Sequence, residues 1–216
     1  MRKNSWQPPS PNELRVSLNN IQRRFVRSNL ELLDVVLESL TRLQEKLKGQ
    51  NPTAFFLWNI SQVGKKNTYK RKDENALSDF VKMHFDYDLK GQNIVINREV
   101  EIKRSTGVKD GARTDIYIQA VNRENHEDHF SLVIETKGCW NPDLDTSMEN
   151  QLKGKYLSKY KSVVGIYLVG WYYCKHLKAP AKHKNVSKVN KILDTQAQEL
   201  STDGLVFKGY ILDCGI

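Results

Sequence analysis

The chain has 216 residues, of which 39% are apolar and 27% charged, which is typical of a folded domain of roughly 100–150 residues with a sizeable extension. It has no run near the ~20 apolar residues of a membrane helix, no signal-peptide stretch and no Cys-x-x-Cys pair. We therefore expect a cytoplasmic protein without a membrane partner, a disulfide framework or a structural zinc site.

The net charge of +9 lies in residues 1–72, with 14 Lys/Arg against 5 Asp/Glu, whereas residues 73–216 hold 20 of each. Such a basic block attracts nucleic acid, although a solvated helical face explains it nearly as well.

Apolar residues recur at helical spacing from Pro11 to Lys48. Ser10 is a suitable N-cap, Pro11 suits the first helical position, and Gly49 follows the last periodic residue. One long helix or two shorter helices both satisfy the pattern. The apolar stripe has three explanations: packing on the rest of the chain, pairing with a second copy as a homodimer, or joining a larger assembly.

The polar stretch of residues 65–72 separates this region from the rest of the chain. We draw the domain boundary there, with a basic helical extension over residues 1–64 and a catalytic domain over residues 65–216. The stretch is explained by a solvated linker, or by a stripe in which Lys70, Arg71 and Lys72 contact phosphates.

The second part of the chain alternates between helical and strand patterns. The expected elements, in order, are a helix at 73–85, strands at 93–103, 114–121 and 129–137, a helix at 145–159, a strand at 162–173, a helix at 186–200 and a strand at 204–212. The third strand is apolar on both faces at its centre and should lie in the middle of its sheet. The basic loop at 175–185 offers Lys178 and Lys182 to a phosphate backbone, or is simply exposed.

Two charged residues end that apolar third strand. Glu135 and Lys137 are two positions apart and therefore project from the same face. Burying both is costly unless they pair or bind something, and a salt bridge alone would satisfy this requirement. Asp115 starts the preceding strand, and if the two strands are antiparallel it lies beside both residues.

Two carboxylates and a lysine would then converge. Carboxylate oxygens, with water completing the shell, are the ligands that Mg²⁺ prefers. The ion would neutralise phosphate charge and lower the pKa of a bound water, while Lys137 stabilises the developing charge or helps to position and deprotonate that water. The pattern therefore indicates a metal-dependent phosphodiesterase.

Asp115 followed by Glu135-Thr136-Lys137 resembles the signature of the PD-(D/E)xK nuclease superfamily. The expected order of elements between about residues 73 and 173 is also similar to that superfamily's core of a helix, three strands, a helix and a strand. The resemblance implies a restriction-endonuclease-like α/β fold, with a central mixed sheet flanked by helices and here an N-terminal helical extension. Thr114 stands where many members have proline.

Two further residues match the superfamily on the expected helices. Glu74 stands where many members place an additional acidic residue, and Gln151 resembles the glutamine motif of several branches. The resemblance implies Mg²⁺, with Mn²⁺ able to substitute, held by Glu74, Asp115 and Glu135. It also implies that Lys137 is the catalytic lysine and that Gln151 orients water or that lysine.

We therefore expect a Mg²⁺-dependent endonuclease that acts on DNA more readily than on RNA, similar to the restriction and antiphage-defence nucleases of prokaryotes. Arg113, beside the first aspartate, is a candidate phosphate ligand, although an arginine entering a strand is more often a surface residue. The rival hypothesis is a nucleic-acid-binding or assembly module that keeps the fold without turnover. RNA cleavage stays open, because the metal acts on the phosphodiester and not on the base.

Overall fold

The computed structural model describes residues 10–12, 26–64, 66–90, 93–101, 113–121, 129–157, 162–175, 182–183 and 185–216. Residues 13–25 of the helical region predicted from Pro11 to Lys48 lie outside this part of the chain. None of the described helices combines the length and apolar character that a membrane span requires.

A five-stranded sheet forms the centre of the molecule, and its strands lie in the order β3-β4-β5-β6-β7. β4 pairs antiparallel with both β3 and β5, whereas β6 pairs parallel with both β5 and β7, so the sheet is mixed. β5 lies in the middle, as its apolar centre predicts, and its antiparallel pairing with β4 is confirmed. The strands are β3 (Ile94–Glu101), β4 (Arg113–Val121), β5 (His129–Gly138), β6 (Val164–Trp171) and β7 (Val206–Asp213).

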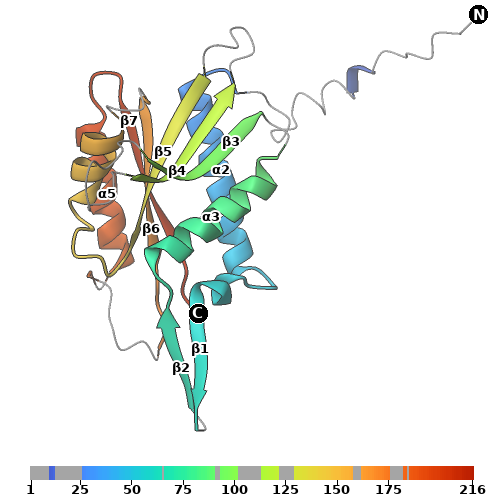
Figure 1. Ribbon diagram of the computed structural model, residues 1–216, viewed down its shortest axis with the longest axis vertical. Coiled ribbons are helices and arrows are strands. Elements are labelled where there is room, and N and C mark those ends of the chain that lie inside the picture. The colour runs from blue at the N-terminus through green and yellow to red at the C-terminus, as the bar shows by residue number, and fades with distance from the viewer. Residues whose placement is uncertain are drawn as a thin grey trace, which may run out of the picture.

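Helices cover both faces of this sheet, which gives three layers (Figure 1). α2 and α3 lie on one face, while the π-helical segment η3 and α5 lie on the other. Asp73 caps α3 and Asn185 caps α5, each accepting hydrogen bonds from backbone N–H groups of the first turn. The helices are α2 (Asn29–Lys48), α3 (Glu74–Asp88), η3 (Met148–Leu157) and α5 (Val186–Leu200).

Alternation along β6 and β7 decides which helix covers which face. Gly170 of β6 lies against Leu77 of α3, whereas Gly165, an odd number of positions away, lies against Leu152 of η3. Leu193 of α5 packs on β7 on the same side as η3. Odd-numbered residues of β5, which share a face with those of β6, therefore point towards η3.

The apolar stripe of α2 packs on the chain's own sheet. Ser28 caps the helix by accepting a hydrogen bond from the backbone N–H of Glu31. The α2 residues that form the stripe are buried in the same core as the strands, and include Leu32, Val36, Leu40, Leu43 and Leu47. Of the three explanations for this stripe, packing within the chain accounts for α2.

A polar network joins α2 to α3. Asp88 accepts hydrogen bonds from Arg42 Nη2 at 2.7 Å, Arg42 Nε at 2.9 Å and Ser39 Oγ at 2.7 Å. His84 Nε2 lies 2.9 Å from the Ser39 carbonyl oxygen, and His84 Nδ1 lies 3.3 Å from Lys46 Nζ. Burial lowers the pKa of His84, so the ring is neutral and accepts from the lysine.

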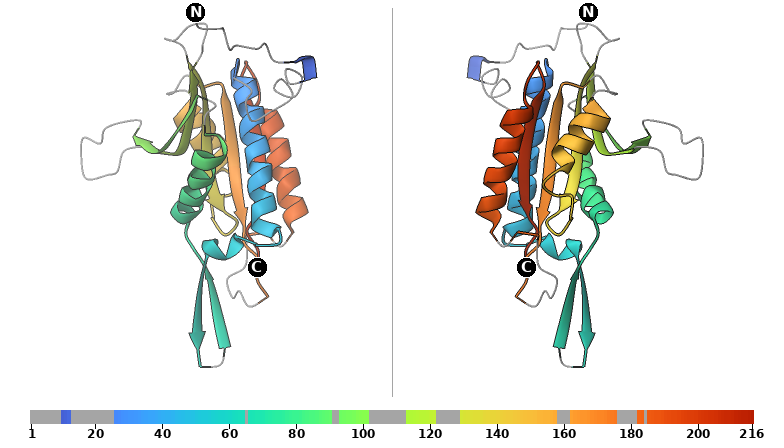
Figure 2. Two further views of the ribbon diagram at one scale, coloured as in Figure 1. Left: turned by 90° about the vertical axis from the view of Figure 1, so that its right-hand side faces the viewer. Right: turned by 90° about the vertical axis from the view of Figure 1, so that its left-hand side faces the viewer.

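A short 3-10 turn, η2 (Ala54–Leu57), leads into an antiparallel hairpin of β1 (Trp58–Val63) and β2 (Lys66–Arg71). Gly64 in its turn has a φ of 61°, a conformation that glycine adopts without strain. The hairpin projects from the body at one end of the molecule (Figures 1 and 2). The boundary expected between residues 64 and 65 thus falls within the hairpin turn.

The α2–α3 network predicts the effect of Asp88→Asn. The substitution removes the charge partner of the half-buried Arg42, so we expect a loss of about 1.5–3 kcal/mol in the free energy of unfolding by urea. Asp86→Asn, on the same helix, breaks only the surface pair with Lys82 and should cost less than about 0.5 kcal/mol. Equal losses in the two variants would contradict a stabilising role for the network.

Candidate active site

Glu135 and Lys137 lie at the carboxyl end of β5, on the face covered by η3. Lys137 Nζ donates to Glu135 Oε1 at 2.6 Å. Lys137 is only 8% exposed and Glu135 only 2%, so their contact is shielded from bulk water. The buried Tyr167 is the β6 partner of Glu135 and donates to the Leu144 carbonyl oxygen at 2.8 Å.

Asp115 is fixed where β4 and β5 stop pairing. The pairing ends at Ile116 and Ile134. Beyond it, Asp115 Oδ2 accepts hydrogen bonds from both the backbone N and the side-chain Oγ1 of Thr136, each at 2.8 Å. A carboxylate oxygen thus takes the place that a carbonyl oxygen of β4 would hold in a continued ladder. Thr136 also bonds Ser78 Oγ of α3 at 2.5 Å on the other face.

Glu74, the first residue of α3, binds the turn that follows β5. Its Oε1 accepts from the backbone N of Gly138 at 2.8 Å and from Asn141 Nδ2 at 2.7 Å. The Trp140 ring lies so close to Gly138 that a Cβ there would come within 2.4 Å of it. The start of α3 and the end of β5 are therefore held together.

The electrostatics of this cluster are dominated by Glu135. Its burial raises the pKa of its carboxyl, Asp115 and Glu74 raise it further, and Lys137 opposes them, with a net result of about 8. Burial lowers the pKa of Lys137, but the Glu135 carboxylate and the other acidic residues outweigh this and the pKa is raised. Glu135 Oε2 is buried and has no hydrogen-bond partner among the described residues.

When all of its groups are ionised, the cluster sets three carboxylates against one ammonium group. Such an excess of negative charge around a buried oxygen is what a divalent cation neutralises. The described residues nevertheless contain no group of three or more His, Cys, Asp or Glu side chains arranged to hold a metal ion. Asp115 and Glu135 are therefore the pair that could hold one with water, since Glu74 Oε1 is bonded to the turn after β5.

Gln151 lies on η3, the segment above the face that carries Glu135 and Lys137. No hydrogen bond in the described part of the structure joins it to either residue or to Asp115. The structure brings four of the predicted site residues together at one end of β5: Glu74, Asp115, Glu135 and Lys137. Gln151 lies on the segment that covers the same face of the sheet but, within the described residues, makes no hydrogen bond to them.

Residues 70–72, which were predicted to contact phosphates, lie at the base of the hairpin. Lys70 is exposed, and the backbone N of Lys72 donates to the Leu57 carbonyl oxygen. The guanidinium of Arg71 stacks on the Trp140 ring, 4.2 Å from its centre. This contact connects the hairpin to the turn that Glu74 binds.

The remaining basic residues are described only in part. Lys182 pairs with Asp145 at 2.9 Å and donates to the Pro142 carbonyl oxygen at 2.5 Å, so it lies beside the turn after β5. Lys178 lies outside the described residues, as does the side chain of Arg113, whose backbone begins β4.

Sequence reasoning missed the residues that hold the carboxylates in place. Asn141 lies in the turn after β5, and nothing in the local sequence pattern indicates that it binds Glu74. The hydroxyl groups of Thr136 and Ser78 were likewise unremarkable in sequence. Comparison of the chain with protein-family models, curated proteins and solved structures gives no match, so no relative supplies a role for these residues.

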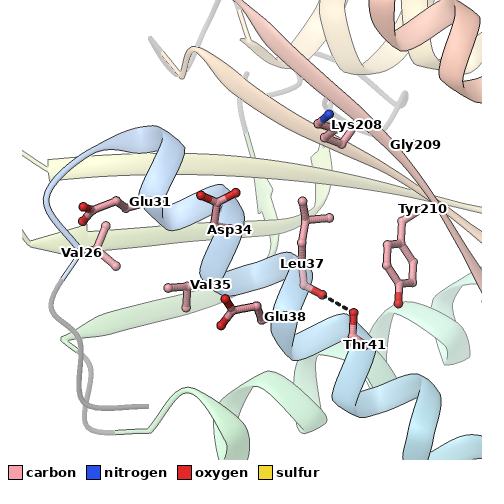
Figure 3. A pocket seen from close by; sticks show the side chains of 10 residues that line it. All are labelled: Val26, Glu31, Asp34, Val35, Leu37, Glu38, Thr41, Lys208, Gly209 and Tyr210. Carbon is pink, nitrogen blue, oxygen red and sulfur yellow. Dashed lines mark hydrogen bonds between the residues drawn. The ribbon is translucent and has the colours of Figure 1, made fainter. Parts of the chain in front are cut away.

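A cavity of about 520 Å³ lies elsewhere, between α2 and β7 (Figure 3). Glu31, Asp34 and Glu38 line it from α2, and Lys208 and Tyr210 line it from β7. Three carboxylates against one lysine disfavour a phosphate, so this cavity does not compete with the end of β5 as a nucleic-acid site.

The raised pKa of Glu135 predicts how stability depends on pH. Because its folded pKa of about 8 exceeds its ordinary value of 4.5, the folded state binds more protons than the unfolded state between these values. Stability should therefore fall as pH rises from about 4.5 to about 8 and level off above about 9. Glu135→Gln should flatten this slope in urea titrations, and Asp34→Asn, an exposed carboxylate of the cavity, should keep it. Parallel slopes for Glu135→Gln and the unsubstituted protein would contradict the assignment.

Proposed function

We propose that this chain is a Mg²⁺-dependent endonuclease of the PD-(D/E)xK type that hydrolyses phosphodiester bonds in nucleic acid, DNA in preference to RNA. The observation that carries the proposal is the buried Glu135 carboxylate, whose Oε2 has no partner among the described residues although Asp115 and Lys137 lie beside it. A structural ion pair would leave no reason to bury a second, unsatisfied oxygen.

The order of elements supports a restriction-endonuclease-like core. α3, β3, β4, β5, η3 and β6 follow one another along the chain, and β3 to β6 are neighbours in the sheet. The aspartate stands at the start of the second strand, and the Glu-x-Lys sequence stands at the end of the third. The catalytic groups of the proposal therefore come from two neighbouring strands of a rigid sheet.

The residues fit a divalent cation. Asp115 and Glu135 offer carboxylate oxygens on neighbouring strands, and Glu74 adds negative charge while holding the turn after β5. When bound, Mg²⁺ neutralises phosphate charge and makes water a better nucleophile at neutral pH. The protein holds these groups in place before substrate arrives, because Thr136 already fixes Asp115.

Lys137 has two uses in such a site. Once a cation compensates the charge of Glu135, the ammonium group is free to stabilise negative charge that develops on a phosphate oxygen. In its neutral form it could accept a proton from the attacking water, although its raised pKa favours the first use near neutral pH. We therefore assign charge stabilisation to Lys137.

A second candidate function has its own support. The 2.6 Å contact between Lys137 and Glu135, together with the engaged Oδ2 of Asp115, is also what an inactive relative would keep as structural contacts. Such a module would bind nucleic acid through its basic segments without turnover.

Plasmid cleavage separates the two functions. With Mg²⁺ we expect nicking or cutting of supercoiled DNA, and a loss of at least about a hundredfold in Asp115→Asn, Glu135→Gln and Lys137→Ala, because each removes a charge at the reacting phosphate. The control is Asp34→Asn, which removes an exposed carboxylate at the α2 cavity. Equal nicking by all proteins, or none by any of them despite DNA binding, would leave the inactive module as the function.

Metal binding itself has a signature that does not require turnover. A ligand must be deprotonated to bind a cation, and the Glu135 carboxyl, with a pKa of about 8, is largely protonated at about pH 7. Titration calorimetry with Mn²⁺ in two buffers of different ionisation enthalpy should therefore detect release of nearly one proton per ion at about pH 7 and almost none at about pH 9. Glu135→Gln should abolish the release. Binding with no proton release at either pH would exclude Glu135 as a ligand.

A further inference from the structure

The two faces of the β1–β2 hairpin differ in what they contact. Asn59 is paired with Lys70, and Ser61 with Thr68, so these four side chains share one face. All four are exposed. Ser61 Oγ and Thr68 Oγ1 are 2.6 Å apart, which links the two strands on this face.

The opposite face anchors the hairpin at its base. Trp58 Nε1 donates to the Cys214 carbonyl oxygen at 2.7 Å, and its ring packs against Tyr172. Arg71, the strand partner of Trp58, stacks on Trp140. These contacts fix the base beside the turn that follows β5, so the hairpin stands at the same end of the molecule as Glu135.

The hairpin and the residue that follows it form a basic segment. The sequence from Trp58 to Lys72 holds five Lys/Arg and no Asp/Glu. The two strands pair only with each other among the described residues. A two-stranded ribbon adds little to stability, and its exposed edges invite aggregation, so the fold alone gives no reason to keep one.

We propose that this hairpin is a DNA-reading arm that enters the major groove of a B-form duplex. The major groove, ~12 Å wide and ~8.5 Å deep, admits a two-stranded ribbon, and strands of six residues reach about 20 Å from their base. Asn59 and Lys70 are neighbours on the exposed polar face, next to the base of the hairpin, so the ribbon would lie along the groove with this face towards the bases. Their side chains are of the kinds that bond adenine and guanine edges.

This inference deepens the proposed endonuclease function and rests on it for the choice of DNA. A duplex held by the hairpin would have its backbone near the end of β5, because Arg71 and Trp140 join the hairpin base to that end. Recognition then comes from β1 and β2, and the reacting phosphate is met by Asp115, Glu135 and Lys137.

Binding without cleavage tests the arm. Fluorescence anisotropy in EDTA would compare a duplex of about 20 base pairs, roughly two helical turns, with the single strand and with an RNA duplex of the same sequence. The variant is the double substitution Asn59→Ala and Lys70→Ala, at exposed positions where folding is easily verified by thermal melting. The matched control is Lys208→Ala, an exposed lysine at the α2–β7 cavity.

We expect the double variant to bind duplex DNA about tenfold more weakly. The slope of the logarithm of its binding constant against the logarithm of salt concentration should be smaller by about one. Lys208→Ala should change neither the affinity nor the slope. The RNA duplex should bind weakly to every protein, because the A-form major groove is too narrow for a ribbon. Unchanged DNA affinity in the double variant, or an equal loss on single strands or the RNA duplex, would overturn groove reading.

A small substrate separates this proposal from the endonuclease. Hydrolysis of bis(4-nitrophenyl) phosphate with Mn²⁺ needs the site but not the hairpin. The double variant should keep this activity and Glu135→Gln should lose it. If the unsubstituted protein hydrolyses the substrate but the double variant binds duplex DNA with unchanged affinity, the arm alone is refuted. If the unsubstituted protein shows no hydrolysis but the double variant loses duplex binding, the endonuclease is refuted and the arm is retained.

Discussion

The ionisable carboxyl group that the central strand carries into the interior at Glu135 is the constraint on which this end of the molecule depends. A carboxylate that is 2% exposed loses most of its hydration, and its single bond to Lys137 leaves Oε2 unsatisfied among the described residues. Asp115 and Glu74 add to the penalty instead of relieving it. A more apolar pair would pack at least as well, and this is the reason for proposing a cation at this position.

The divergence of β4 from β5 lets the sheet support this charge. Past Ile134 the backbone N–H groups of Thr136 and Gly138 lack recorded strand partners in β4, and they are taken instead by the carboxylates of Asp115 and Glu74. On the other side, pairing with β6 continues to Gly138. One strand thus positions three acidic side chains, because its own unsatisfied donors attract two of them.

The elements were predictable because each has a strong local period, and the described helices and strands lie close to the predicted ranges. The neighbourhood of Asp115 and Glu135 followed from one assumption, the antiparallel pairing of two consecutive strands, which the structure confirms. The hairpin was not predicted, because residues 65–72 have few apolar side chains and the ribbon buries a side chain such as Trp58 only at its base, which leaves little alternation to detect. The hydrogen bond from Asn141 to Glu74 joins residues 67 positions apart, so no local sequence pattern indicates it.

Charge is divided between the hairpin and the site, and the division bears on how a polyanion could approach. Residues 73–216 are neutral overall, and around Glu135 acidic groups outnumber the lysine, so a metal-free site repels phosphate. The hairpin carries positive charge without any acidic residue, and its base is joined to the same end of the molecule through Arg71 and Trp140. Attraction must therefore come first from the hairpin and the other basic segments. In the proposed endonuclease, a cation held between Asp115 and Glu135 would reverse the local sign, so entry of the scissile phosphate would depend on the metal.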